Sequence, residues 1–289
     1  MATQQPKGFA GYLSFLKTAG QTSTGPAVWT TGAPTFTCPA GLIMPRNPDN
    51  FSYPGVINAQ GAPTVKVQGK ATPTVTISGI PLKSSFCTPT FFNDLIAAGS
   101  TYLDTNLNSS EYTIVVHNGN AIREYQGSKC QQLSLYQTAP GGPILLDMQW
   151  LCKKGDQSTS GATAPAVDAG TLLDITKVTF SSENITAVYD WRLTLMRPQA
   201  YNMQVDGTLF SDDLQSGMIG GTFVYTTSPL SATILSAGVS IAIASSTAVT
   251  IAINVQRDDP AEDVVPALGR KTFSYTLIKS TAGYPVAIS

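Results

Sequence analysis

Residues that could carry out catalysis are scarce in this chain. His117 is the only histidine, and a catalytic histidine needs a nucleophile and an orienting acid close to it. No G-x-S-x-G, G-x-x-x-x-G-K-[ST] or G-x-G-x-x-G pattern occurs. His117 instead precedes Asn118-Gly119, which is typical of a hairpin turn, so we interpret it as a turn residue. The sequence predicts no enzyme, no catalytic or cofactor-binding residues and no cofactor.

Two groups of residues could suggest a metal ion. The first is a group of four acidic residues between positions 258 and 263, which could bind calcium. This acidic group lacks the alternating oxygen ligands and the glycine of a calcium loop. We therefore expect a solvated loop there, and with one histidine and no C-x-x-C pair we expect no zinc site. The cysteines should be reduced thiols packed as small hydrophobes. The acidic group comprises Asp258, Asp259, Glu262 and Asp263, and the cysteines are Cys38, Cys87, Cys130 and Cys152.

Composition describes a folded chain with an unusually uncharged surface. Hydrophobic residues make up 42% of the 289 residues, enough for substantial cores. Charged residues make up 12%, about half of the usual share of about 25%. A monomer with so few charges has little to keep it apart from its neighbours, which predicts surface buried against other subunits. The net charge of −1 argues against tight, charge-driven binding of nucleic acid.

No membrane segment is expected. Met1 to Lys7 shows no charged region followed by an apolar core, so we expect no signal peptide. Leu230 to Val255 has no charged residue, a length that could cross a bilayer. Large and small residues alternate over 239–243 and 249–255, however, which predicts two strands around a turn at 245–247.

Two segments share the same local pattern. Thr88-Pro89 begins one and Gly99 ends it; Ser228-Pro229 begins the other and Ala237-Gly238 ends it. A hydroxyl residue, a proline and a closing glycine are the start and stop signals of a helix. Strand-like residues flank both segments, which predicts a tandem duplication with one short helix in each copy.

The rest of the chain is punctuated like a β protein. Alternating segments separated by Gly, Pro and Asn predict a mainly β fold with two β domains, each with one short helix and long loops. Arg197 to Gly221 and Arg257 to Arg270 are long enough to predict functional loops. The predicted parts are a proline-rich N-terminal arm with loops (1–60), a first domain (61–155), a linker (156–175) and a second domain (176–289).

Two segments resemble the tail tube proteins of long-tailed bacteriophages. The first is Arg123-Glu124-Tyr125-Gln126-Gly127-Ser128-Lys129-Cys130-Gln131-Gln132-Leu133-Ser134-Leu135 followed by Pro140-Gly141-Gly142. The second is Gly220-Gly221-Thr222-Phe223-Val224-Tyr225 after a strand pair and a long loop. The resemblance covers residues 60 to 280, and the proline-rich start and the Ala/Ser-rich final strands depart from it.

The resemblance implies a structural virion protein of the duplicated-domain type. Such subunits are small β-barrels or sandwiches with a flanking helix and a long β-hairpin loop, and their inner sheets join edge to edge around a channel. Two domains per chain imply rings of three chains; single-domain members form hexamers, which is the alternative here. The implied partners are further copies of the chain, the tape measure protein and transiting DNA, and the tail terminator and distal tail proteins. The implied location is the virion tail, after synthesis in the host cytoplasm.

A surface role of a different class is also open. A virion-surface or secreted β-sandwich adhesin that binds carbohydrate would share the β content and the Thr/Ser richness. It would need clusters of exposed aromatic side chains, whereas we expect Trp29, Trp150 and Trp191 to be interior, since the last two lie on strand patterns. On the tail tube hypothesis, residues 2–17 and 197–221 should contact other subunits or rings.

Overall fold

Antiparallel strands and one short helix make up the described part of the protein, so the predicted mainly β fold is confirmed. The structure is a computed structural model that describes residues 11–17, 35–38, 43–46, 50–52, 66–68, 73–96, 111–117, 122–138, 142–159, 170–174, 178–181, 188–201, 214–227, 236–244, 247–258, 271–278 and 285–289. The elements of the first part of the chain are β1 (Gly11–Lys17), β2 (Thr35–Cys38), β3 (Ile43–Arg46), β4 (Asn50–Ser52), β5 (Lys66–Gln68), β6 (Thr74–Pro81), α1 (Pro89–Ile96), β7 (Tyr112–His117), β8 (Ile122–Gln137) and β9 (Leu145–Thr159). Those of the second part are β10 (Val178–Ser181), β11 (Val188–Met196), β12 (Gln199–Tyr201), β13 (Leu214–Ser216), β14 (Gly220–Thr227), β15 (Ser236–Ile243), β16 (Val249–Arg257), β17 (Lys271–Leu277) and β18 (Val286–Ile288).

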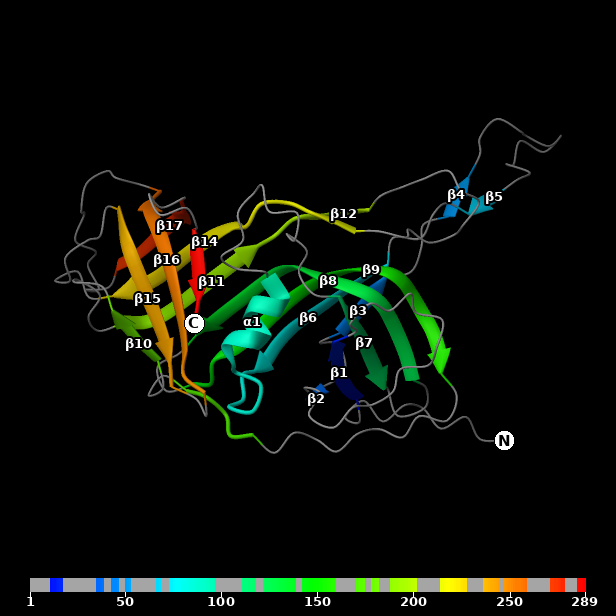
Figure 1. The fold of residues 1–289 in the computed structure, drawn as a ribbon, viewed down its shortest axis with the longest axis horizontal. Helices are drawn as coiled ribbons and strands as arrows, with labels where there is room; N and C mark the ends of the chain where they lie inside the picture. The colour runs from blue at the N-terminus through cyan, green and yellow to red at the C-terminus, as the bar shows by residue number, and fades with distance from the viewer. Residues whose placement is uncertain are drawn as a thin grey trace.

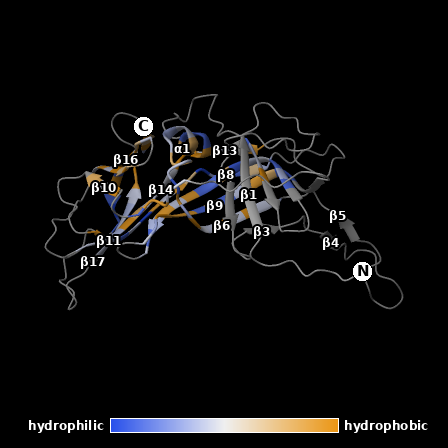
Figure 2. Cartoon of the chain, turned by 90° about the horizontal axis from the view of Figure 1, so that it is seen from below, coloured by the Kyte–Doolittle hydropathy of each residue, from blue (hydrophilic) through white to orange (hydrophobic). Residues whose placement is uncertain are grey.

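One 14-stranded sheet contains all of these strands except two short hairpins, β4–β5 and β12–β13. The sheet is antiparallel and curls into a half-barrel, and α1 lies beside β8 (Figure 1). Apolar and polar residues alternate along the strands (Figure 2). This alternation places one side of each strand in the core and the other side toward the surface.

The same order of strand pairing occurs twice along the chain. In the first half the neighbours in the sheet are β1-β7-β8-β9-β6-β3. In the second half they are β10-β15-β16-β17-β14-β11. If the strands of each half are numbered along the chain, without β2, β18 and the two hairpins, both orders are 1-4-5-6-3-2. A two-stranded hairpin interrupts each half at the same place, between the second and third strands.

Strand β8 joins the two halves. One of its edges pairs with β9 along nearly its whole length. Its other edge pairs first with β7, over Ile122 to Ser128, and then with β11, over Gln132 to Gln137. Gly127 lies between two irregularities in the pairing of β8 with β9. Its φ is 59°, a conformation that favours glycine. The bend lets β8 leave β7 and serve as the edge on which the second half begins.

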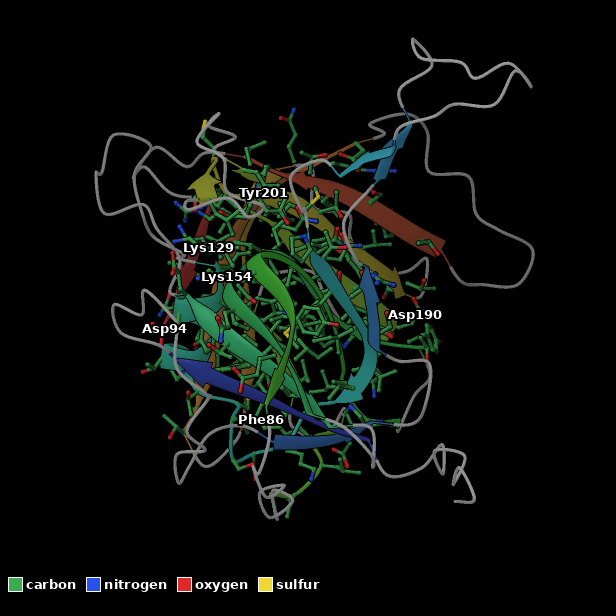
Figure 3. The ribbon with its side chains drawn as sticks, turned by 90° about the vertical axis from the view of Figure 1, so that its right-hand side faces the viewer. Phe86, Asp94, Lys129, Lys154, Asp190 and Tyr201 are labelled. Atoms are coloured by element: carbon green, nitrogen blue, oxygen red, sulfur yellow. The ribbon has the colours of Figure 1, made fainter. Side chains whose placement is uncertain are left out.

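A single hydrophobic cluster fills the interior of both halves. Trp150 and Trp191 lie in it with at most 2% of their surface exposed, which confirms that these two tryptophans are interior. Cys87, Cys130 and Cys152 are buried thiols outside any disulfide, as the sequence predicted; Cys38 has no described side chain. Figure 3 shows the first half end-on, with side chains packed inside the curl of the sheet.

Helix α1 begins as the sequence predicted. The backbone N–H of Phe91 donates to Thr88 Oγ1 at 3.2 Å, so Thr88 is the N-cap and Pro89 the first helical residue. Gly99, the predicted end, lies outside the described residues, as does the predicted start of the second helix at 228–235. The predicted end of that helix is wrong: Ala237 and Gly238 lie in β15 and pair with β16. Pairing with an alternating apolar strand outweighs the local helix-stop signal there.

Replacing the cap should weaken the helix measurably. Thr88→Ala removes the acceptor for the Phe91 N–H, and we expect the free energy of unfolding to fall by about 1 kcal/mol. Urea unfolding followed by tryptophan fluorescence measures the change. Thr88→Ser keeps the hydroxyl acceptor and should retain most of the stability; equal losses in both variants would contradict the capping role.

Two boundaries differ from the sequence prediction. The N-terminal residues were expected to be an arm and loops, but β1 and β3 belong to the main sheet, paired with β7 and β6. Proline forces the preceding residue out of the helical region but leaves the strand region open, and Pro45 lies in β3, which among the described strands pairs only with β6. Within the predicted linker, residues 156–159 belong to β9, which runs to Thr159. Leu173, also in it, is buried, and its backbone bonds to Leu82 and Ile144.

Candidate functional site

A row of polar side chains crosses the sheet from the first half to the second. Cross-strand pairing places its members side by side on six neighbouring strands, β9, β8, β11, β14, β17 and β16. We call this set the polar row: Asp147, Ser134, Thr194, Thr222, Thr276 and Gln256. Its neighbours along each strand, such as Leu135, Leu193 and Phe223, point into the core, so the polar row lies on the opposite face of the sheet.

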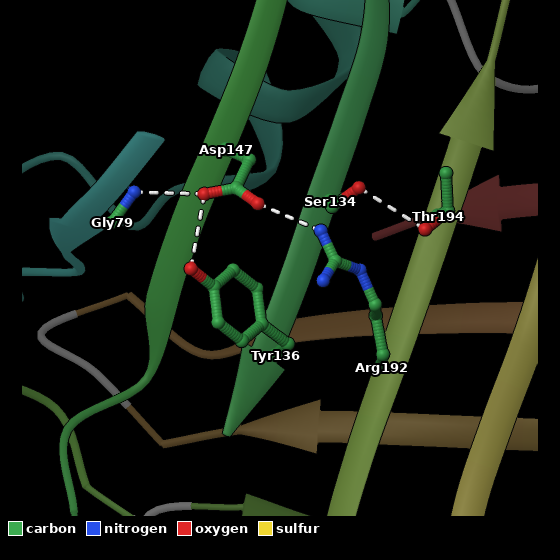
Figure 4. Close-up of polar contacts among 6 residues, drawn as sticks. All are labelled: Gly79, Ser134, Tyr136, Asp147, Arg192 and Thr194. Carbon is green, nitrogen blue, oxygen red and sulfur yellow. Dashed lines mark hydrogen bonds and ion pairs between the residues drawn. The ribbon is translucent and has the colours of Figure 1, made fainter. Parts of the chain in front are cut away.

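The polar row is continuous across the junction between the halves. Ser134 on β8 and Thr194 on β11 are directly paired, and their hydroxyl oxygens lie 3.0 Å apart (Figure 4). Next to them, Arg192 Nη2 donates to Asp147 Oδ2 at 2.7 Å, and the Arg192 guanidinium lies 4.5 Å from the centre of the Tyr136 ring. Asp147 Oδ1 accepts from Tyr136 Oη and from the N–H of Gly79. These contacts join β6, β9, β8 and β11 on one face.

The charges on and beside the polar row are one ion pair and one carboxylate held by hydroxyl groups. Asp147 is paired with Arg192, which has 47% of its side chain exposed. Asp258 follows β16 and accepts hydrogen bonds from the hydroxyls of Ser274 and Thr276, which lower the pKa of its carboxyl group. Burial, with Asp147 nearby, raises the pKa of Tyr136, so its hydroxyl stays protonated as a donor at neutral pH. The face therefore presents hydroxyl and amide groups and no row of cations.

Among the described residues, those singled out in the sequence lie on different elements. His117 ends β7, where it pairs with Ile122 on the part of β8 that does not reach the polar row. Burial raises the pKa of the Cys130 and Cys152 thiols to about 12, which disfavours the reactive thiolate. Of the predicted acidic group only Asp258 is described. Among the described residues no three His, Cys, Asp or Glu side chains are grouped as metal ligands.

Exposed aromatic side chains for sugar stacking are not a feature of the described surface. Its exposed large hydrophobic residues are Leu172, Met196 and Met218. No helix in the described ranges is long and apolar enough to cross a membrane. The 230–255 segment instead contributes β15 and β16, which confirms the predicted strands.

A second arrangement, which the sequence analysis treated only as a long loop, fastens the two halves together. Hairpin β12–β13 belongs to the second half and lies against the first. Lys129 on β8, with 2% of its side chain exposed, donates to the carbonyl of Leu214 on β13 at 2.8 Å. Tyr201 on β12 donates its hydroxyl to the carbonyl of Pro73, directly before β6, at 2.7 Å. Lys129 and Tyr201 lie on the same side of the curled sheet in Figure 3.

The start of this hairpin is anchored as well. The Arg197 backbone N–H donates to the carbonyl of Gln131 on β8, and its Nη1 donates to the carbonyl of Ile96 at the end of α1. Arg197 is 1% exposed, and its cation lies at the carbonyl end of the helix, where positive charge is favourable. We call hairpin β12–β13 and these contacts the clasp.

Comparison with known proteins leaves the family of the chain open: its sequence matches no known family and no curated protein.

Proposed function

We propose that the protein is the major tail tube subunit of a long-tailed bacteriophage, and that its two halves are tandem tail-tube-like domains. Three chains would form a ring, and stacked rings would enclose the channel through which DNA and the tape measure protein pass. The tail terminator and distal tail proteins would bind the two ends of the tube. The protein would be made in the host cytoplasm and act in the virion.

The observation that carries the proposal is the β8–β11 junction. The strand series β3-β6-β9-β8 continues directly into the equivalent series β11-β14-β17-β16, so one unit joins the next by its edge strand. Repeating this junction between chains would place the β3 edge of one copy against the second half of the next. A head-to-tail contact of this kind closes into a ring when the rotation per unit fits. Closure also pairs edge strands that would otherwise promote aggregation.

The polar row supports a channel wall on the inner face of such a ring. Lysine and arginine contacts to phosphates release counterions and make DNA binding tight. The polar row consists mainly of threonine, serine and glutamine, and its one carboxylate, on Asp147, is neutralised by the guanidinium of Arg192. Such a wall gives DNA no such contacts. The low charge content of the whole chain fits the large area that ring formation would bury.

Electron microscopy and mass measurement of the purified protein test the proposal. We expect tubes or stacked rings with a central channel on concentration, and three chains per ring by mass photometry of the smallest closed species. Six chains per ring would overturn the stoichiometry. If the protein stays monomeric at every concentration, even when preformed tail ends are added, the proposed function is wrong.

A further inference from the structure

The clasp has a counterpart in the first half. Hairpin β4–β5 follows β3 as hairpin β12–β13 follows β11, and β3 and β11 are the second strands of their halves. Strand β3 ends at Arg46 and β11 at Met196. A proline follows two positions later in each half, Pro48 and Pro198, and an aromatic residue three positions after it, Phe51 and Tyr201.

The two hairpins differ in what they meet within the chain. Hairpin β12–β13 lies against the first half through Tyr201, Arg197 and Leu214. Hairpin β4–β5 forms a separate two-stranded sheet and lies away from the main sheet in Figures 1 and 2. In a ring, the first half of each chain would lie next to the second half of a neighbouring copy.

We propose that hairpin β4–β5 is a clasp between chains: it lies across the second half of the neighbouring copy, with Phe51 beside Met218. This rests on the proposed ring and names the surfaces that hold it together. The position of the contact follows from the repeat. Within the chain, Tyr201 contacts Pro73, the residue directly before β6. The strand equivalent to β6 in the second half is β14, and the residue directly before β14 is Ile219.

The side chains at the two ends of this contact are both apolar. Met218, next to Ile219, is 62% exposed and is the most exposed large hydrophobic residue of the described surface. Phe51 lacks the hydroxyl with which Tyr201 reaches a carbonyl, so its contact would be apolar. Covering Met218 with an aromatic ring removes apolar surface from water and adds a sulfur–aromatic contact.

Cysteine cross-linking between two separately purified variants tests the contact. Phe51→Cys and Met218→Cys are mixed, assembled and treated with a short bis-maleimide. We expect the cross-linked mixture to give a band at the mass of two chains, and we expect no such band from either variant alone. The double variant should give a ladder that ends at three chains. Wild-type protein reports any reaction of the native thiols, of which Cys87, Cys130 and Cys152 are buried.

A matched control uses another exposed position. Thr179→Cys on β10, mixed with Phe51→Cys, should give no two-chain band. If tubes form but the Phe51→Cys and Met218→Cys mixture gives no more product than this control, the inter-chain clasp is wrong while the tail tube function stands. If neither rings nor tubes form with wild-type protein, the proposed function fails and the clasp with it. Cross-links confined to single chains of the double variant would also overturn the clasp.

Discussion

Gly221→Ala should be among the most destabilising single substitutions in this protein. Gly221 pairs with Leu195 on β11 and has a φ of 155°, and a Cβ there would overlap the carbonyl oxygen of Thr194. Neither backbone can give way without breaking the pairing beside the junction of the two halves. We expect a loss of about 3 kcal/mol in the free energy of unfolding, measured by urea denaturation.

The adjacent glycine is the matched control. A Cβ on Gly220 would meet no atom within 4 Å, so Gly220→Ala should change stability by no more than about 0.5 kcal/mol. If both variants were equally stable, the close approach of β11 to β14 would be wrong. On the proposed function, Gly221→Ala should also abolish tube formation at temperatures where the folded variant still survives.

On the proposed function, Thr222→Lys should give a channel that retains DNA. Thr222 is a half-buried member of the polar row, between Thr194 and Thr276, so each ring would gain one cation per chain facing the channel. Stacked rings would present many phosphate contacts. With about six contacts, affinity should fall about a thousandfold between 50 and 200 mM salt. The measurement is retention of a short duplex by assembled tubes, with nuclease protection to show that it lies inside.

Thr179→Lys adds the same charge at an exposed position on β10, away from the polar row. We expect any duplex that it binds to be digested by the nuclease. Equal protection by both variants, or protection by wild-type tubes at 50 mM salt, would show that the polar row does not face the channel.

Signals that act over a few residues were predictable from the sequence. Thr88-Pro89 places the start of α1, and Asn118-Gly119 predicts the β7–β8 hairpin, because cap and turn chemistry is set by neighbouring residues. The alternation in 239–243 and 249–255 likewise predicts β15 and β16. Each of these features depends on residues close together in the chain.

Features that depend on distant pairing were not predictable. Nothing local in the proline-rich start shows that β1 pairs with β7 or β3 with β6. The polar row has a visible trace in the sequence, since hydroxyl residues alternate in Thr272, Ser274 and Thr276. Only the registers of five strand pairs, however, bring its members from six strands together. The absence of catalytic residues stays a prediction.

The repeated order of strands has a kinetic consequence. In both halves the first strand pairs with the fourth: Tyr12 lies opposite His117, and Val178 opposite Ile243. Closing such long stretches of chain costs entropy before any contact forms, and folding slows as pairing becomes less local. The β7–β8, β8–β9 and β15–β16 hairpins should form first, while β1 and β10 wait for their partners. Until then each half exposes an unpaired edge, so a nascent chain is most prone to aggregate before these two strands dock.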